Sequence, residues 1–361
     1  MAGAVETEAW NRDGRIDVLR GMLLLLMVCN HIPSLLGEAT SRALGMLSAA
    51  EGFVLLSALL AGTAIHRRTL RAAPGIGRWA MGRAVMLYAT HAAMLAFGIL
   101  WIVALDLPDL PISWIHADLL ADPVPMGMAT ALLAHRPSFT DMLPIYILGY
   151  LAVPLLARIA AWDWRWLPAL GALLWLAGRL DPATPALRQL TGLPLHGGSF
   201  EPCSWLGLFV AGVGIGWRLH AGPVRLPGPV VAVALVVSAL CWLSGAVPGV
   251  LDDWLAYAAK ESLGPVRVVA LAAAAVALVG CRRWVRCDRW RWARPWMLAG
   301  RASLPLYAIH VPLVIVAQTV LMAVNPGWLL PMLATGLIVC CCLGTALWWP
   351  ALTPRRSAVF S

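Results

Sequence analysis

The sequence predicts an all-α integral membrane protein, a polytopic helix bundle with about ten transmembrane helices. The first observation is composition, because 60% of the residues are hydrophobic and only 12% are charged, against about 25% charged residues in soluble domains. The second is a series of apolar runs long enough to cross a hydrocarbon core of about 30 Å as helices. The third is that arginine-rich segments alternate with acidic or neutral segments between those runs. No soluble domain of useful size remains once the runs are removed.

The first expected span lies within Arg15–Leu36, after a short polar lead at residues 1–14. Its charged entry and short apolar core would also suit a signal peptide, but the many later spans favour an uncleaved helix. The later spans are expected in apolar runs of the same kind. They are Ala43–Ile65, Ala84–Leu105, Met142–Ala157, Trp166–Gly178, Pro202–Trp217, one run within Leu226–Leu251, Leu263–Gly280, and two runs within Ala302–Pro354 that the turn signal Asn325-Pro326-Gly327 separates.

The loops between these spans sort by charge. Arginine-rich loops follow every second span, and acidic or neutral loops follow the others. The positive-inside rule then predicts that both termini are cytoplasmic, with one membrane domain at 15–354 and a short tail at 355–361. The longest non-spanning segment, Asp106–Asp141, is acidic, rich in proline and predicted to lie outside. Trp101 lies just before this segment and Trp114 lies within it. Both could stack on a sugar, and a position at the membrane interface explains them equally well.

Charge and cysteine content exclude other classes of protein. The net charge is +9, but the arginines fall in short clusters between apolar runs, which indicates cytoplasmic loops and not nucleic-acid binding. The eight cysteines form no CxxC pair and no spacing typical of secreted domains, so the sequence predicts neither a metal site nor a disulfide framework. The expected surroundings are membrane lipids.

His31 is the first candidate for chemistry, because it lies in the first span where lipid disfavours polar groups. Arg20 and His31 are eleven residues apart, which at 100° per residue places them within roughly 20° of one helix face and about 16 Å apart along the axis. Polar residues at such depth usually face the bundle interior or a wet cavity and are candidates for function. A structural hydrogen bond to a neighbouring helix is the alternative interpretation.

Glu51 in the second span is expected at about the same depth as His31, because the two helices run in opposite directions. A carboxylate beside an imidazole is stabilised and fixes its tautomer. The two residues therefore predict a general base with its orienting acid, an arrangement that deprotonates hydroxyls in acyl transfer. A hydrogen bond that only locks the two helices together fits the same spacing.

Three further ionisable residues fall in or beside apolar runs. Arg83 stands at a cytoplasmic helix entry, as Arg20 does, and His91 lies two turns further on. Such arginines are often only topogenic, and their other use is to clamp an anion in fork geometry. His310, one turn after Tyr307, lies near the middle of the ninth span and is a second candidate catalytic histidine.

Several motifs resemble the OpgC family of bacterial membrane acyltransferases, which is related to the acyltransferase-3 superfamily. They are RIDVLRG followed by NHIP, AAEGFVLLSALLAG, DMLPIYILGYLAVPLL (Asp141–Leu156), FEPCSWLGLFVAGVGIGW (Phe200–Trp217), KESLGPVR (Lys260–Arg267) and GRASLPLYAIH (Gly300–His310). Arg20 and His31 are also similar to the arginine–histidine signature of the wider superfamily. The resemblance spans nearly the whole chain.

This resemblance implies an enzyme of the bacterial inner membrane that moves an acyl group from cytoplasmic acyl-CoA to a hydroxyl of a periplasmic glycan. For OpgC-like proteins the acyl group is typically succinyl and the acceptor an osmoregulated periplasmic glucan. The implied catalytic residues are His31, Glu51 and His310. Arg20, Arg83 and His91 are expected to bind the acyl-CoA, and Lys260 and Arg267 to bind the acceptor.

The sequence also departs from the family pattern. Asn30 stands where an acid usually precedes the histidine, and Ser57-Ala58 replaces the usual serine-glycine step. The tyrosine–histidine ending of the ninth span is more typical of the broader superfamily, which widens the expected acyl group to succinyl or acetyl. Direct transfer and a covalent acyl-enzyme on His31 or Ser57 both remain open.

One competing class is a proton-coupled transporter of a small polar or sugar-like solute, which would also use His and Glu residues on an inner face. The sequence has no inverted repeat and no pair of matching broken helices to favour it. A purely structural membrane protein would have no reason to place His31, Glu51 and His310 at depth. Acyl transfer is therefore the favoured function.

Overall fold

A computed structural model describes residues 14–70, 75–105, 121–180, 183–193, 195, 198–222, 224–246, 257–282, 290–324 and 327–352. In these ranges every regular element is helical and none is a strand, which confirms the all-α prediction. Residues 1–13 of the predicted lead, residues 106–120 of the predicted outer loop with Trp114, the Asn325-Pro326 part of the predicted turn and the predicted tail at 355–361 lie outside the described residues.

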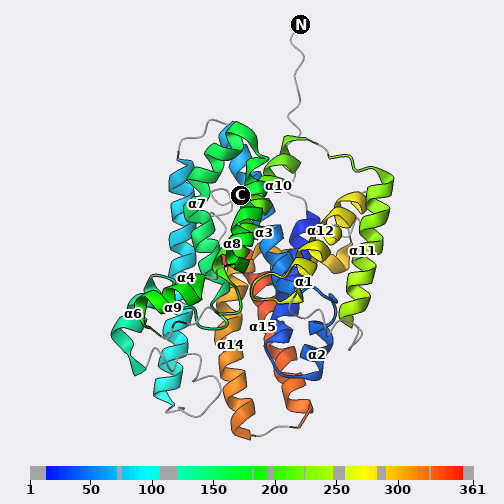
Figure 1. Cartoon of the computed structure of the whole chain (residues 1–361). Coiled ribbons are helices and arrows are strands. Elements are labelled where there is room, and N and C mark those ends of the chain that lie inside the picture. The colour runs from blue at the N-terminus through cyan, green and yellow to red at the C-terminus, as the bar shows by residue number, and fades with distance from the viewer. Residues whose placement is uncertain are drawn as a thin grey trace.

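The long helices pack side by side into a bundle (Figure 1). The ten long helices of the described ranges are α1 (Gly14–Asn30), α3 (Ala49–Leu70), α4 (Ile76–Ala104), α7 (Met142–Asp163), α8 (Trp166–Leu180), α10 (Pro202–Ala221), α11 (Gly228–Ala246), α12 (Pro265–Cys281), α14 (Ser303–Val324) and α15 (Leu329–Leu352). Shorter elements connect them: α2 (Leu35–Ser41), α6 (Pro123–Ala131), α9 (Ala183–Thr191), η3 (Arg291–Ala293) and α13 (Arg294–Arg301).

Six of the described helices are long and apolar enough to cross a membrane, namely α3, α4, α7, α11, α14 and α15. Two shorter apolar helices, α8 and α12, accompany them. This supports a multi-pass membrane protein. Helix α1 has 17 residues and carries Asp17 in its first turn, so its apolar part is shorter than that of the six.

Helices α1 and α3 lie in the interior of the bundle. They carry many fully buried residues, including Leu24, Val28 and Val54. Helices α6 and α9 lie together on one flank, and α11 and α12 lie on the opposite flank (Figure 1). None of the side chains described on α11 forms part of the main buried cluster. The candidate residues of the first span therefore lie at the centre of the protein and not at its edge.

Helix α1 ends at Asn30, earlier than the single helix through Leu36 that the sequence predicted. Proline has no N–H and disfavours helical geometry in the preceding residue, so Pro33 stops the helix. Ser34 then caps α2, because its side chain accepts a hydrogen bond from the Gly37 N–H at 3.0 Å. His31 consequently lies in a turn just past the end of α1.

Helices α1 and α13 cross at very close range. A Cβ atom added to Gly300 would lie 1.9 Å from the Asp17 carbonyl oxygen, and one added to Gly21 would lie 1.9 Å from the Trp296 carbonyl oxygen. Backbone atoms cannot move aside as a flexible side chain can. Only glycine at both positions permits this crossing, which fixes α1 against the chain that leads into α14.

We expect Gly300→Ala to lower the free energy of unfolding by about 1–3 kcal/mol, because the added methyl overpacks the α1–α13 crossing. Gly336→Ala in α15 is the matched control, since nothing lies within 4 Å of its added Cβ and alanine is the better helix former by up to about 1 kcal/mol. Thermal unfolding of the two variants in detergent tests this. Equal stability of the two variants would contradict the described crossing.

Candidate functional site

The first and the next-to-last long helix bring two distant motifs together. The Arg20 Nη2 donates a hydrogen bond to the Ser303 Oγ at 2.7 Å, and its Nη1 donates to the Gly300 carbonyl at 3.3 Å. Asp17, fully buried, pairs with Arg301 at 3.1 Å. The charged lead of α1 is therefore bound to the junction of α13 and α14, and Asp17 is a partner that sequence reasoning did not single out.

A second contact between α1 and α14 lies further along both helices. The His31 and His310 rings stack with centroids 5.3 Å apart and planes 17° from parallel. Because Arg20 pairs with Ser303 and His31 with His310, the two helices run in the same direction. The structure thus brings together the two histidines that the sequence singled out separately.

These stacked imidazoles hold unused hydrogen-bonding groups. His310 has 0% of its surface exposed, and both of its ring nitrogens and the Nδ1 of His31 have no hydrogen-bond partner in the described structure. Buried polar atoms are nearly always partnered in folded proteins. The unpartnered nitrogens make this histidine pair a candidate part of a binding site.

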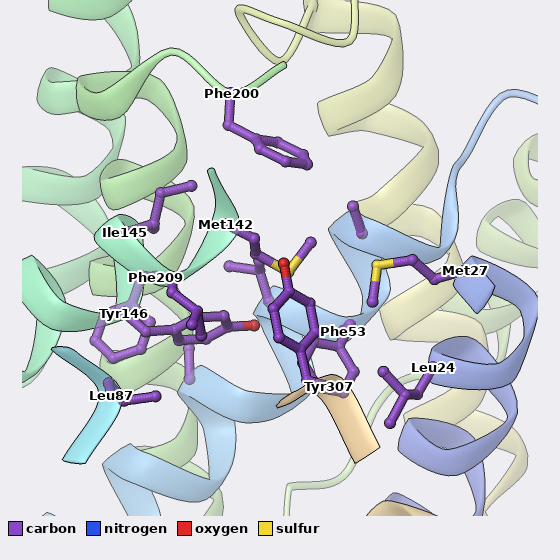
Figure 2. Close-up of a cluster of buried hydrophobic side chains, with 14 of the residues drawn as sticks. Leu24, Met27, Phe53, Leu87, Met142, Ile145, Tyr146, Phe200, Phe209 and Tyr307 are labelled. Carbon is purple, nitrogen blue, oxygen red and sulfur yellow. The ribbon is translucent and has the colours of Figure 1, made fainter. Parts of the chain in front are cut away.

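Beside the histidines lies a cavity of about 110 Å³. It brings Arg20 and Arg83 together, as expected if both bind one anionic ligand. Its polar lining is Arg20, Ser57, Arg83, Tyr146, Tyr150, Ser303 and Tyr307. Figure 2 shows Tyr146 pointing from α7 toward Tyr307 and Phe53 at the centre of the buried cluster.

Tyr307 connects the cavity with the histidine pair. Its side chain lines the cavity, and its ring lies 4.9 Å from the His310 ring in an edge-on arrangement. Its hydroxyl donates a hydrogen bond to the Phe139 carbonyl at 2.7 Å. One side chain therefore borders the arginine-lined cavity, the buried histidine and the segment that precedes α7.

Glu51 does not pair with His31, and this corrects the expected acid–base pair. Its Oε1 accepts from Arg267 Nη1 at 2.6 Å, and its Oε2 accepts from the backbone N–H and the hydroxyl of Ser48. The reason is rotation: equal depth on two antiparallel helices does not fix which way each side chain faces. Glu51 is 0% exposed, so its carboxylate needs a nearby cation, and the mostly buried Arg267 supplies it.

Lys260 and Arg267, expected together at the acceptor site, separate in the structure. Arg267 is committed to Glu51 and to the Ala258 carbonyl. Lys260 instead extends its ammonium over the Phe200 ring, 5.2 Å from the centroid, and interacts electrostatically with His31 and Asp141. Lys260 is therefore the member of the pair whose charge acts on His31.

The segment before α7 contributes two buried charged residues, Asp141 and Arg136. Burial raises the pKa of Asp141, against the hydrogen bond from the Ser199 N–H and the charge of Arg136, which lower it. Arg136 is 2% exposed and donates to the Phe200 carbonyl at 2.8 Å and to Thr184 at 3.2 Å. These contacts fix the segment to Phe200, over whose ring the Lys260 ammonium lies.

His91 lies outside the arginine-lined cavity. It is 1% exposed and lies near Thr140, just before α7. His91 follows Arg83 by eight residues on α4, which places it about 12 Å further along the helix axis. This separates it from Arg20 and Arg83, with which it was expected to bind the acyl-CoA.

Gln318 of α14 is a site residue that the sequence did not reveal. Its Nε2 donates a hydrogen bond to the His31 carbonyl at 2.6 Å, across 287 residues of sequence. Carbonyls at a helix end lack intrahelical partners, so this contact satisfies the chain where α1 stops. A single glutamine in an apolar run is the only sequence signal that marks it.

The described residues contain no group of three or more His, Cys, Asp or Glu side chains able to hold a metal ion. The chemistry available is that of imidazoles, guanidinium groups, hydroxyls and one ammonium. Together they suit binding of an anionic ligand at one end of the site and proton transfer at the other.

A comparison with protein families matches the family described as OpgC protein over residues 12–353. No curated protein and no solved structure matches the chain. The family match confirms the resemblance seen in the motifs of α1, α3, α7, α10, α12 and α14. Since it covers nearly the whole chain, the protein belongs to the OpgC family, and this membership with its apolar helices indicates a membrane-bound, glucan-modifying acyltransferase.

Proposed function

We propose that the protein transfers a succinyl or acetyl group from cytoplasmic acyl-CoA to a hydroxyl of an osmoregulated periplasmic glucan. In this proposal about ten helices span the bacterial inner membrane with both termini in the cytoplasm. The observation that carries it is one continuous line of polar side chains through the bundle, from Arg20 and Arg83 through Tyr307 to His31 and His310.

The arginine-lined cavity is the proposed donor site. Guanidinium groups bind phosphates and carboxylates in fork geometry, and both arginines lie toward the end of the bundle proposed to face the cytoplasm. A cavity of about 150 Å³ holds one benzene ring, so a cavity of about 110 Å³ suits the acyl and thioester end of the donor. The nucleotide end then stays at the cytoplasmic mouth.

His31 is the proposed general base. It takes the proton from the acceptor hydroxyl, the hydroxyl oxygen forms a bond to the thioester carbon, and the carbon–sulfur bond breaks. The proton leaves with the CoA thiolate. His310, fully buried behind His31, holds the first ring in place, and Gln318 holds the backbone of His31.

Glu51 and Arg267 have a supporting role in this mechanism, because they bind each other and no contact given for the described ranges joins either of them to His31 or His310. Lys260 is proposed to contact the acceptor, since it does not line the donor cavity and its charge acts on His31. Acyl transfer through a covalent acyl-enzyme would require a nucleophilic side chain close to the thioester carbon. Ser57 lines the cavity and is the residue that such a route would use.

The test uses purified protein in sided proteoliposomes with acyl-CoA added at the cytoplasmic face and a β-linked glucose oligosaccharide inside. We expect acylated oligosaccharide, and we expect Arg83→Gln to raise the KM for acyl-CoA at least about tenfold, because a charge-assisted contact contributes about 1.5–3 kcal/mol. Arg165→Gln is the control, since its side chain is 78% exposed. Accumulation of unmodified sugar driven by a proton gradient would instead establish a transporter.

A further inference from the structure

Phe139, just before α7, has an unusual backbone. Its φ angle is +66°, in the left-handed region that side chains other than glycine seldom adopt. Such conformations persist where the surrounding structure holds them, and they gather at functional sites. A simple connection between two helices would not require a positive φ at Phe139, so its contacts must account for it.

Contacts on both sides hold this backbone in place. Tyr307 donates its hydroxyl to the Phe139 carbonyl at 2.7 Å, which ties the residue to α14 one turn before His310. Three residues earlier, the buried Arg136 fixes the segment to Phe200 and Thr184. The conformation is thus determined by two anchors, each from a different part of the fold.

The result is that the Phe139 ring lies against the catalytic histidine. Its centroid is 5.0 Å from that of His31, with the rings 73° apart. The Phe139 side chain is only partly buried, whereas His310, which stacks on His31, is fully buried. Lys260 interacts electrostatically with the same histidine. The Phe139 ring therefore borders an imidazole whose Nδ1 has no hydrogen-bond partner in the described structure, and whose nearby charges include the Lys260 ammonium.

We propose that Phe139 is the aromatic platform on which a sugar ring of the acceptor lies, so that one sugar hydroxyl points at His31. This rests on the proposed function. A glucose ring has an apolar C–H face that packs on an aromatic ring and hydroxyls around its edge. Binding sites combine such apolar faces with a few fixed polar groups, and Lys260 and His31 are those groups here.

The test measures steady-state transfer from succinyl-CoA to a β-linked glucose oligosaccharide with Phe139→Leu and Phe139→Tyr. We expect Phe139→Leu to raise the acceptor KM about tenfold and to leave the succinyl-CoA KM unchanged, because the leucine lacks the flat face. Phe139→Tyr keeps that face, so its acceptor KM is expected to stay near that of the unsubstituted protein. Phe97→Leu is the control, because Phe97 stacks on Trp101 of its own helix.

A lower kcat with an unchanged acceptor KM in Phe139→Leu would overturn the platform, because it would show that the ring only positions His31. Unchanged kinetics would overturn it as well. Melting temperatures within a few degrees of the unmodified protein exclude misfolding as the cause of any change. If the unmodified protein transfers no acyl group, the proposed function fails and the platform falls with it.

Discussion

His31→Gln is expected to lower kcat by about 10²–10⁴-fold, the usual contribution of a general base. Glutamine has a similar reach and can hydrogen-bond, but it cannot take a proton at neutral pH. The KM for acyl-CoA should stay near its original value, because the arginine-lined cavity is unchanged. Initial rates with purified protein at saturating donor and acceptor provide the measurement.

The matched control for this substitution is His220→Gln. His220 lies in the last turn of α10, where the centroid of its ring is 5.2 Å from that of the His66 ring. It is not part of the candidate site. We expect it to retain ordinary activity. A His31→Gln protein that keeps more than about one tenth of kcat would remove His31 from the role of base.

Glu51→Gln is expected to lower the free energy of unfolding by about 3–5 kcal/mol, because breaking a buried ion pair leaves an uncompensated charge. Glu51 is 0% exposed and the Arg267 side chain only 17% exposed. The amide oxygen can still accept the two hydrogen bonds from Ser48, but the amide NH2 then faces Arg267, which is itself a donor. Unfolding by heat in detergent micelles measures the loss.

The double variant Glu51→Gln with Arg267→Met separates a structural role from a catalytic one. Removing both charges avoids an unpaired cation, so it should recover most of the lost stability. Activity should return with the folded protein. A Glu51→Gln protein of normal stability but with kcat lowered a hundredfold would instead mean that Glu51 acts on the reaction, as the sequence spacing first suggested.

The helical architecture and the main site residues could be predicted from the sequence because each leaves a local signal. Apolar runs reveal spans, and a histidine or arginine inside a run is conspicuous. His31 and His310 were candidates for that reason, and the structure brings them into contact. Arg20 and Arg83 likewise meet in one cavity.

Side-chain partners across helices could not be predicted, because the sequence does not fix how helices rotate about their axes. Depth alone placed Glu51 beside His31, whereas rotation turns it to Arg267. The same holds for Gln318, whose partner is far away in the chain. The backbone of Phe139 is also a product of tertiary anchors, since nothing in its local sequence demands a positive φ.

The most direct measurement is mass spectrometry of periplasmic glucans from cells with the intact gene, with the gene deleted, and with His31→Ala, at equal membrane abundance of the two proteins. The account predicts an acyl mass increment only with the intact protein, and the increment itself identifies succinyl or acetyl. Glucans that are unchanged among the three strains, with the protein abundant, would contradict acyl transfer to a glucan at His31.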